Sequence, residues 1–376
     1  PTRPSPALAA HRGLRTVRAS AQAGAAAAVG PAGLPVSALP SPVKCHFCPW
    51  RSYPALTADS HSLHVLRFSQ TVGVDITERM RRRAQHAGSW YTDRSTDLKA
   101  ELEGWLARAD ECCNAPRAII APHAGYSYSG ETAAWAYKQL CGTEAKRIFV
   151  LGPSHHEYTP KCALTQCEMY ETPLGNIAID MEACATLRAT GEFEDMALSV
   201  DEAEHSIEMH LPYIVQVMGK RPFKLVPILV GALSSKAEAA YGKLLAPLLL
   251  DPENAFIISS DFCHWGRRFR FTHYDPKEGE IYQSIEALDK QGMALIEAQD
   301  PSAFAKYQAE FGNTICGCHT RLALGTRLPA LDARRSGRVL GTETSEGGQN
   351  GHNESKEAVW RRSFCMTDGL CAIRSP

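Results

Sequence analysis

Short apolar runs alternate with amphipathic segments through the middle of the chain. Runs rich in Ile, Val and Phe predict buried strands at 117–122, 147–152, 223–230 and 254–260. Apolar side chains at helical spacing predict helices at 98–106, 131–140, 206–218, 237–250, 279–298 and 301–311. This alternating order predicts an α/β fold, a single domain with a mainly parallel central sheet flanked by helices.

Chemically capable side chains follow three of these predicted strands at the same end. They are His123, His155, His156, Asp261 and His264. Ligands of open α/β sheets bind beyond the carboxyl ends of the strands. His123 and His156 are far apart in sequence, but they follow the two strands of one β-α-β unit, which can make them neighbours in space. The convergence predicts one shared site.

Each of these residues also has a plainer interpretation. A single histidine is more often a packing or capping residue than a ligand, and the chain has no His-Glu-x-x-His motif. His205 and His210 are five positions apart, which does not put both rings on one helix face. Cys316 taken alone is a candidate buried apolar residue. Cys263 is predicted to be a core residue, because strand alternation points it away from Asp261.

Composition narrows the class of partner and the compartment. The chain has 376 residues and a net charge of −1, so no basic field attracts nucleic acid or an anionic membrane. No apolar run is long enough to predict a membrane span. The 13 cysteines are odd in number and scattered, which favours a reducing compartment. The predicted location is the cytoplasm, and the nucleus as well.

The two ends of the chain differ in character from the middle. Residues 1–58 contain no Asp or Glu and are rich in Ala, Pro, Ser and Arg. This composition resembles an organelle-targeting peptide, but the favoured interpretation is a leader outside the functional protein, with Met80 as the start. Residues 333–357 lack apolar periodicity, so the tail is expected not to pack on the core. The predicted division is leader 1–83, domain 84–319 and divergent, disordered tail 320–376.

A family resemblance rests on six segments that occur in order. They are HAGSWY (86–91), APHAGYSYSG (121–130), LGPSHH (151–156), DEAEHSIEMHLPY (201–213), SSDFCHWG (259–266) and NTICG (313–317). The domain resembles the Memo family, mediators of receptor-driven cell motility. That family is similar in fold to the LigB-type class III extradiol dioxygenases.

The resemblance implies a metal site and its residues. It places metal ligands at His123, His156 and Cys316, for iron(II) or copper(I), with zinc as a further candidate. It places catalytic positions at Asp261 and His264, the latter where the dioxygenases carry a proposed acid/base. Further pocket residues implied in this way are His155, His205, Glu208, Tyr126 and His319.

Two departures from the family patterns affect the functional interpretation. The dioxygenases use a glutamate as third metal ligand, whereas this chain offers Cys316, a softer thiolate. This favours a metal-binding signalling adaptor that recognises a phosphotyrosine-containing protein or peptide in the dioxygenase-like cleft. The alternative is an active non-haem dioxygenase or other metal-dependent oxidoreductase. After Cys318 and His319 the family's closing helix and strand are replaced by an unrelated tail, so the last strand of the sheet is expected to be missing.

Overall fold

The structure is a computed structural model that describes residues 81–110, 116–319, 337–344 and 360–366. These residues belong to a single compact unit of the chain. The predicted leader lies outside the described residues, apart from its last three positions.

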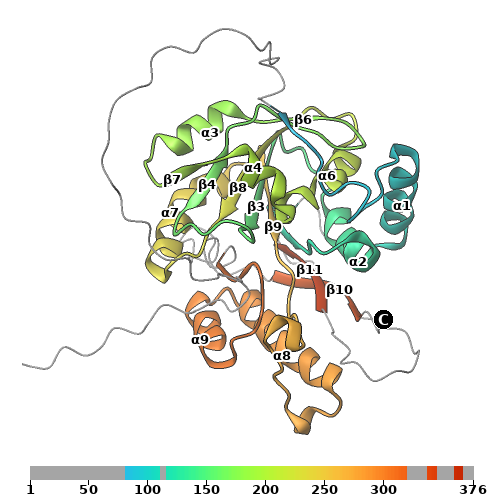
Figure 1. Cartoon of the computed structure of the whole chain (residues 1–376), viewed down its shortest axis with the longest axis vertical. Coiled ribbons are helices and arrows are strands. Elements are labelled where there is room, and N and C mark those ends of the chain that lie inside the picture. Colours follow the sequence, from blue (N-terminus) through green and yellow to red (C-terminus); the bar gives the residue numbers. More distant parts are fainter. Residues whose placement is uncertain (1–80, 111–115, 320–336, 345–359, 367–376) are drawn as a thin grey trace, which may run out of the picture. The chain divides into compact units, whose positions relative to one another are not determined.

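A mainly parallel sheet forms the centre of the fold, as predicted (Figure 1). The strand order is β10-β11-β2-β9-β3-β8-β4-β7. Strands β2, β9, β3 and β8 run parallel to one another, whereas β4 is antiparallel to β8 and parallel to β7. The bounds are β2 (Ala118–Ala121), β3 (Arg147–Pro153), β4 (Cys162–Thr165), β7 (Phe193–Met196), β8 (Lys224–Val230), β9 (Asn254–Ser259), β10 (Gly337–Thr344) and β11 (Trp360–Met366). All four predicted strands are present, as β2, β3, β8 and β9.

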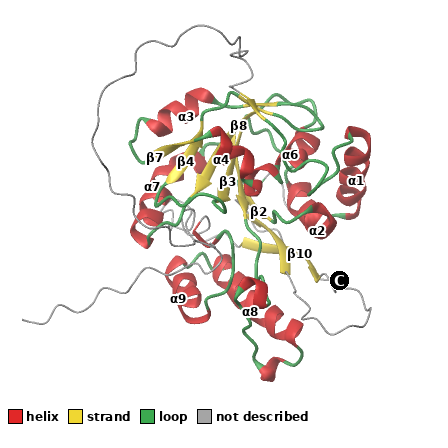
Figure 2. Cartoon of the chain, in the orientation of Figure 1, coloured by secondary structure: helices red, strands yellow, loops and turns green. Residues whose placement is uncertain are grey.

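Helices flank this sheet (Figure 2). They are α1 (Ser95–Arg108), α2 (Tyr126–Gln139), α3 (Met181–Arg188), α4 (Leu198–Ala203), α5 (His205–Glu208), α6 (Leu211–Met218), α7 (Ser235–Leu250), α8 (Ile281–Glu297) and α9 (Pro301–Phe311), with the 3-10 turns η2 (Arg267–Phe269) and η3 (Pro276–Glu278). The helix predicted at 206–218 is two helices, α5 and α6. Pro212 lies in the first turn of α6, where its missing N–H costs nothing, so a new helix begins there. Among the described residues, no helix is both long and apolar enough to cross a membrane.

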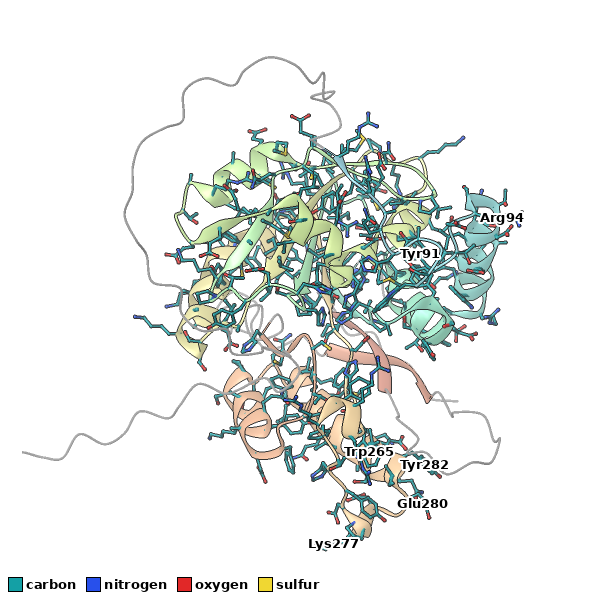
Figure 3. All side chains as sticks on the ribbon, viewed as in Figure 1. Tyr91, Arg94, Trp265, Lys277, Glu280 and Tyr282 are labelled. Carbon is teal, nitrogen blue, oxygen red and sulfur yellow. The ribbon has the colours of Figure 1, made fainter. Side chains whose placement is uncertain are left out.

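The apolar strands bury their side chains in a main core, where Phe149 and Phe256 of neighbouring strands stack with ring centroids 4.5 Å apart. A second, smaller core joins α8 and α9 to the loops that carry Phe262 and Cys318. Cys263 lies in this second core, which confirms that it is a core residue. Figure 3 shows the contrast between buried and exposed side chains. Tyr91 is buried, whereas Arg94 at the start of α1 points outward.

The edge of the sheet contains two segments of the predicted tail. β11 pairs antiparallel with β2, matching Phe364 to Ile120, and β10 pairs antiparallel with β11. These two segments therefore differ from the expectation of a tail that does not pack and of a missing last strand. Their strand structure comes from pairing at the edge, a contact that a local sequence pattern does not record. The remaining tail residues lie outside the described part of the chain.

A small separate sheet carries the N-terminal end of the described chain. It has the order β1-β5-β6, with bounds β1 (Arg81–Arg82), β5 (Met169–Tyr170) and β6 (Ile177–Ala178). Through β1 it delivers Arg82 to the interior, beside the helices α4 and α5.

Candidate metal centre

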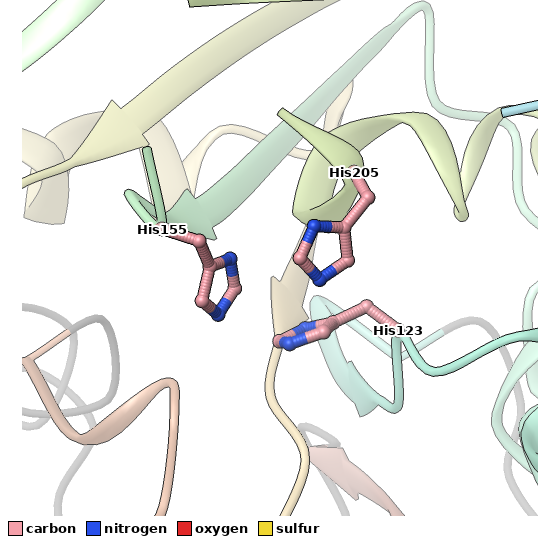
Figure 4. Close-up of side chains that lie close together, drawn as sticks. All are labelled: His123, His155 and His205. Carbon is pink, nitrogen blue, oxygen red and sulfur yellow. The ribbon is translucent and has the colours of Figure 1, made fainter. Parts of the chain in front are cut away.

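Three histidines meet beyond the carboxyl ends of the central strands. His123 follows β2, His155 follows β3, and His205 begins α5. One ring nitrogen of each lies within 4.8 Å of those of the other two (Figure 4). The rings of His155 and His205 stack with centroids 4.4 Å apart, and the His123 ring meets both edge-on. The expectation that strand ends bring imidazoles together therefore holds for His123 and His155.

A glycine at the end of β3 lets α5 approach closely enough to deliver His205. A Cβ atom on Gly152 would lie 2.5 Å from Ser206 Oγ and 2.7 Å from the Ile207 side chain. Real Cβ atoms essentially never approach that closely. The Ser206 hydroxyl also donates to the Pro153 carbonyl at 2.8 Å, which fixes α5 on the strand end.

Hydrogen bonding at the end of β9 sets the proton on His123. The Ser259 hydroxyl donates its single proton to the Ser206 carbonyl at 2.7 Å. Ser259 Oγ therefore accepts from His123 Nδ1, 2.6 Å away, so the proton of a neutral His123 sits on Nδ1. His123 Nε2 then faces the other imidazoles with a free lone pair. This atom is buried and has no hydrogen-bond partner among the described residues.

A thiol approaches the cluster from the loop after α9. Cys316 Sγ lies 3.8 Å from His264 Nδ1 and 3.9 Å from His264 Nε2. The next residue, Gly317, allows this approach, because a Cβ there would lie 2.5 Å from the Ser259 carbonyl oxygen. The backbone N–H of Cys316 donates to the Asp261 carbonyl at 3.2 Å. The loop is thereby fixed against the end of β9.

Electrostatics favour a thiolate at this position. Burial alone would raise the pKa of Cys316, but the charge on His264 holds it well below its usual value. Burial opposes the protonation of His264, yet Cys316 and Asp261 raise its pKa to about 10. The result is a buried thiolate beside an imidazolium, and a thiolate is the form of cysteine that binds metal.

Asp261 connects the His123 and Cys316 sides of the site. Its Oδ1 accepts the backbone N–H of His123 at 2.9 Å. Its Oδ2 lies 3.8 Å from His123 Nε2 and 3.7 Å from His264 Nε2. The Asp261 carboxylate therefore lies between the rings of His123 and His264.

A buried ionic network supports the segment that carries His205. Arg82 donates to the Asp201 carboxylate at 3.0 Å and to Glu208 Oε2 at 2.8 Å. Glu208 also accepts from His86 Nδ1 at 2.8 Å and from the Tyr91 hydroxyl at 2.9 Å. Glu208 is thus a structural partner of Arg82, His86 and Tyr91.

The remaining expected residues are distributed as follows. His156 is exposed, and its ring lies 6.2 Å from that of His205, so the structure puts His155 where the sequence analysis expected His156. His319 pairs with Glu238 of α7 at 2.6 Å. Tyr126 is buried and donates its hydroxyl proton to the Met209 carbonyl at 2.8 Å, which is a packing role.

His205 and Glu204 were not expected among the residues at the centre of the site. His205 was compared with His210, which instead hydrogen-bonds Tyr137 through Nδ1 at 2.7 Å. Its true neighbours, His123 and His155, come from distant strands. The sequence feature that could have indicated them is the run of acidic residues and histidine at 201–208. Asp201, Glu204 and Glu208 of this run are buried.

The donor set fits a metal ion. Imidazole nitrogen and thiolate sulfur are ligands that suit zinc, copper and iron. The unpartnered Nε2 of His123, buried among imidazoles, is the atom that a metal would satisfy. His123, His155 and Cys316 would hold such an ion, with His205 as a fourth donor. An ion with open positions there supplies Lewis-acid chemistry.

Comparisons with known proteins identify the family of the chain. A family model described as Memo-like protein matches residues 82–352. Protein MEMO1 of Danio rerio is 56% identical over 240 residues, which cover 63% of this chain and 81% of that protein. Protein MEMO1 of Homo sapiens is 53% identical over 240 residues, with the same coverage. Protein memo-1 homolog of Caenorhabditis elegans is 48% identical over 237 residues, 63% of this chain and 68% of the relative. Because the family model matches well over half of the chain, the chain belongs to the Memo family.

Proposed function

We propose that this Memo-family chain is a metal-binding protein whose ion is held by His123, His155 and Cys316, with His205 as a fourth donor. The observation that carries the proposal is the buried Nε2 of His123, which faces two other imidazoles without a hydrogen-bond partner among the described residues. A buried polar atom without a partner is costly unless something satisfies it. A metal ion at the centre of the cluster removes that cost.

The proposed ion is iron(II) or copper(I), with zinc as the further candidate. A mixed thiolate and imidazole set binds all three, and a single thiolate makes the site softer than the carboxylate-containing sites of non-haem iron oxygenases. The charge on His264 holds the pKa of Cys316 well below its usual value, which favours the thiolate, the form that binds metal. Metal analysis after anaerobic purification identifies the ion.

Two single cysteine substitutions test the proposed site. Cys316→Ser removes the proposed sulfur ligand, whereas Cys263→Ser changes another buried thiol, which lies in the second core. We expect one ion per chain in the wild type and in Cys263→Ser, and a large loss in Cys316→Ser. Equal metal content in all three proteins would refute the site.

We further propose that the protein acts as a signalling and cell-motility adaptor in the cytoplasm and nucleus, with a phosphotyrosine-containing protein or peptide as partner. Support comes from the family resemblance and from the described cysteines, which form no disulfide with one another, as suits a reducing compartment. Titration with N-acetyl-phosphotyrosine amide, and with N-acetyl-tyrosine amide as control, tests the partner. Fluorescence microscopy of the tagged chain tests the compartment. Equal binding of the two amides would refute phosphate recognition.

His264 favours an oxygenase or oxidoreductase as the alternative. Cys316 and Asp261 raise its pKa, which favours a protonated imidazole beside the proposed ligands, a group that can donate a proton. In this alternative the protein residues would bind and orient a substrate while His264 delivers a proton. Oxygen uptake by the iron-loaded protein with catechols, lost in His264→Gln, would favour this function over a purely binding role.

A further inference from the structure

One carboxylate contacts two of the clustered histidines. Glu204 Oε1 lies 2.9 Å from His155 Nδ1 and 3.4 Å from His205 Nδ1. Its Oε2 accepts the backbone N–H of His155 at 2.6 Å. Oε1 also accepts the backbone N–H of Ser206 at 2.9 Å. Glu204 is only 2% exposed, so these contacts are made out of water, where they are strong.

These contacts favour one nitrogen of each ring over the other, through a hydrogen bond at His155 and through ion-pair distance at His205. A carboxylate repels a nitrogen lone pair and attracts an N–H, so it favours a proton on the Nδ1 atoms of both His155 and His205. The two rings stack at an interplanar angle of 23°. With both Nδ1 atoms turned to Glu204, both Nε2 atoms point the same way. Figure 4 shows one nitrogen of each ring directed toward His123.

Glu204 is itself held in place from behind. Arg82 Nη2 donates to the Glu204 carbonyl at 2.9 Å, and Arg82 also binds Asp201 and Glu208 on either side of it. The Glu204 backbone is therefore fixed by Arg82, while its carboxylate is held between the His155 backbone and the two rings.

We propose that Glu204 is a positioning residue that holds His155 and His205 with Nδ1 protonated and Nε2 facing His123, so that one carboxylate orients two of the donors. The inference rests on the proposed function only for its effect on metal. Carboxylates behind metal-binding histidines fix ring orientation and raise ligand basicity. Here the same group serves two rings from two elements, β3 and α5, which couples their positions.

The isosteric change Glu204→Gln tests the proposal. An amide has one accepting oxygen, so it cannot accept from His155 Nδ1 through one atom and from the His155 backbone through the other. The matched control is Glu202→Gln, because Glu202 precedes Glu204 by two residues and accepts the Arg83 backbone N–H at 3.0 Å. The control changes the same charge on the same segment without touching the rings.

The first measurement needs no metal. Nitrogen-15 NMR of the metal-free wild type is expected to show Nδ1–H protons on His155 and His205 that exchange slowly with solvent. Glu204→Gln is expected to lose or shift both signals, and Glu202→Gln neither. Nδ1 atoms without protons in the wild type would overturn the inference, and this readout stands even if a variant fails to fold.

The second measurement is calorimetric titration with zinc(II) as a redox-inactive probe. Glu204→Gln is expected to weaken binding about 10–100-fold, the usual effect of losing a partner behind a ligand. Glu202→Gln is expected to leave it unchanged. Zinc binding that is equal in Glu204→Gln and the wild type would overturn the inference. If the wild type binds no metal while its Nδ1–H signals are as expected, the proposed function fails and the positioning role of Glu204 survives.

Discussion

Replacing Arg82 with methionine tests whether a buried guanidinium holds the site segment together. Arg82 is fully buried and donates to five acceptors on four residues: Asp201, Arg83, Glu204 and Glu208. Methionine fills much of the same volume but leaves two buried carboxylates without their main counter-charge. Removing one partner of a buried ion pair costs about 3–5 kcal/mol.

The other partners of the two carboxylates place the expected loss at the lower end of this range. Asp201 keeps the hydroxyl donors Thr165 and Tyr170, at 2.6 and 2.7 Å. Glu208 keeps His86 and Tyr91. Burial already raises the pKa of Asp201 in spite of Arg82, so this carboxyl group can take up a proton once Arg82 is gone. We therefore expect a loss of about 3 kcal/mol at neutral pH, and less as the pH falls.

The assay is urea unfolding of Arg82→Met beside Arg81→Met. Arg81 is the adjacent residue, but its pair with Glu171 is long, at 3.8 Å, and the Arg81 side chain is 47% exposed. Surface pairs contribute about 0–1 kcal/mol. In thermal unfolding, a loss of about 3 kcal/mol in the free energy of unfolding corresponds to a decrease in Tm of about 6–12 °C for a domain of this size. Equal stability of the two variants would refute the view that Arg82 clamps the segment.

The remaining predictions concern pH and packing. Burial lowers the pKa of His210 to about 3. Between about pH 6.5 and 3 the unfolded chain therefore binds a proton at His210 that the folded chain does not, so the free energy of unfolding decreases as the pH is lowered. We expect His210 to lower the free energy of unfolding by about 2 kcal/mol at pH 5 relative to pH 7.5. In urea unfolding, His210→Gln should lack this difference, whereas His156→Gln, at an exposed position, should keep it. Gly152→Ala should cost about 1–3 kcal/mol and reduce metal content, because the new Cβ meets Ser206, whereas Gly142→Ala, with nothing within 4 Å, should do neither. Equal effects of the two glycine changes would contradict the close approach of α5 to β3.

Much of the sheet and the location of the site could be predicted from sequence. The apolar runs gave β2, β3, β8 and β9, and polar residues directly after β2, β3 and β9 indicated the edge where the site lies. The choice between His155 and His156 could not be predicted in this way. Beyond β3 the chain leaves the ladder, so strand alternation no longer says which neighbour points inward. The choice is made by Glu204, which binds the backbone and ring of His155 from 49 positions away.

The buried ionic network around Arg82 could not be predicted from local sequence patterns either. Arg82 contacts Asp201 across 119 positions and Glu208 across 126, and no periodicity links them. Strand β10 likewise belongs to a stretch without apolar alternation and takes its structure from pairing with β11. Contacts between distant segments decide these features, and a single sequence records such contacts only as isolated polar residues.

The most direct test of the metal centre compares two adjacent histidines. His155 lies in the cluster with His123 and His205, whereas His156 is exposed. Metal content of anaerobically purified His155→Ala and His156→Ala, measured by mass spectrometry beside the wild type, separates the two positions. The proposed site predicts that His155→Ala loses its ion and that His156→Ala keeps it. Loss of metal in His156→Ala with full retention in His155→Ala, or equal metal content in all three proteins, would contradict it.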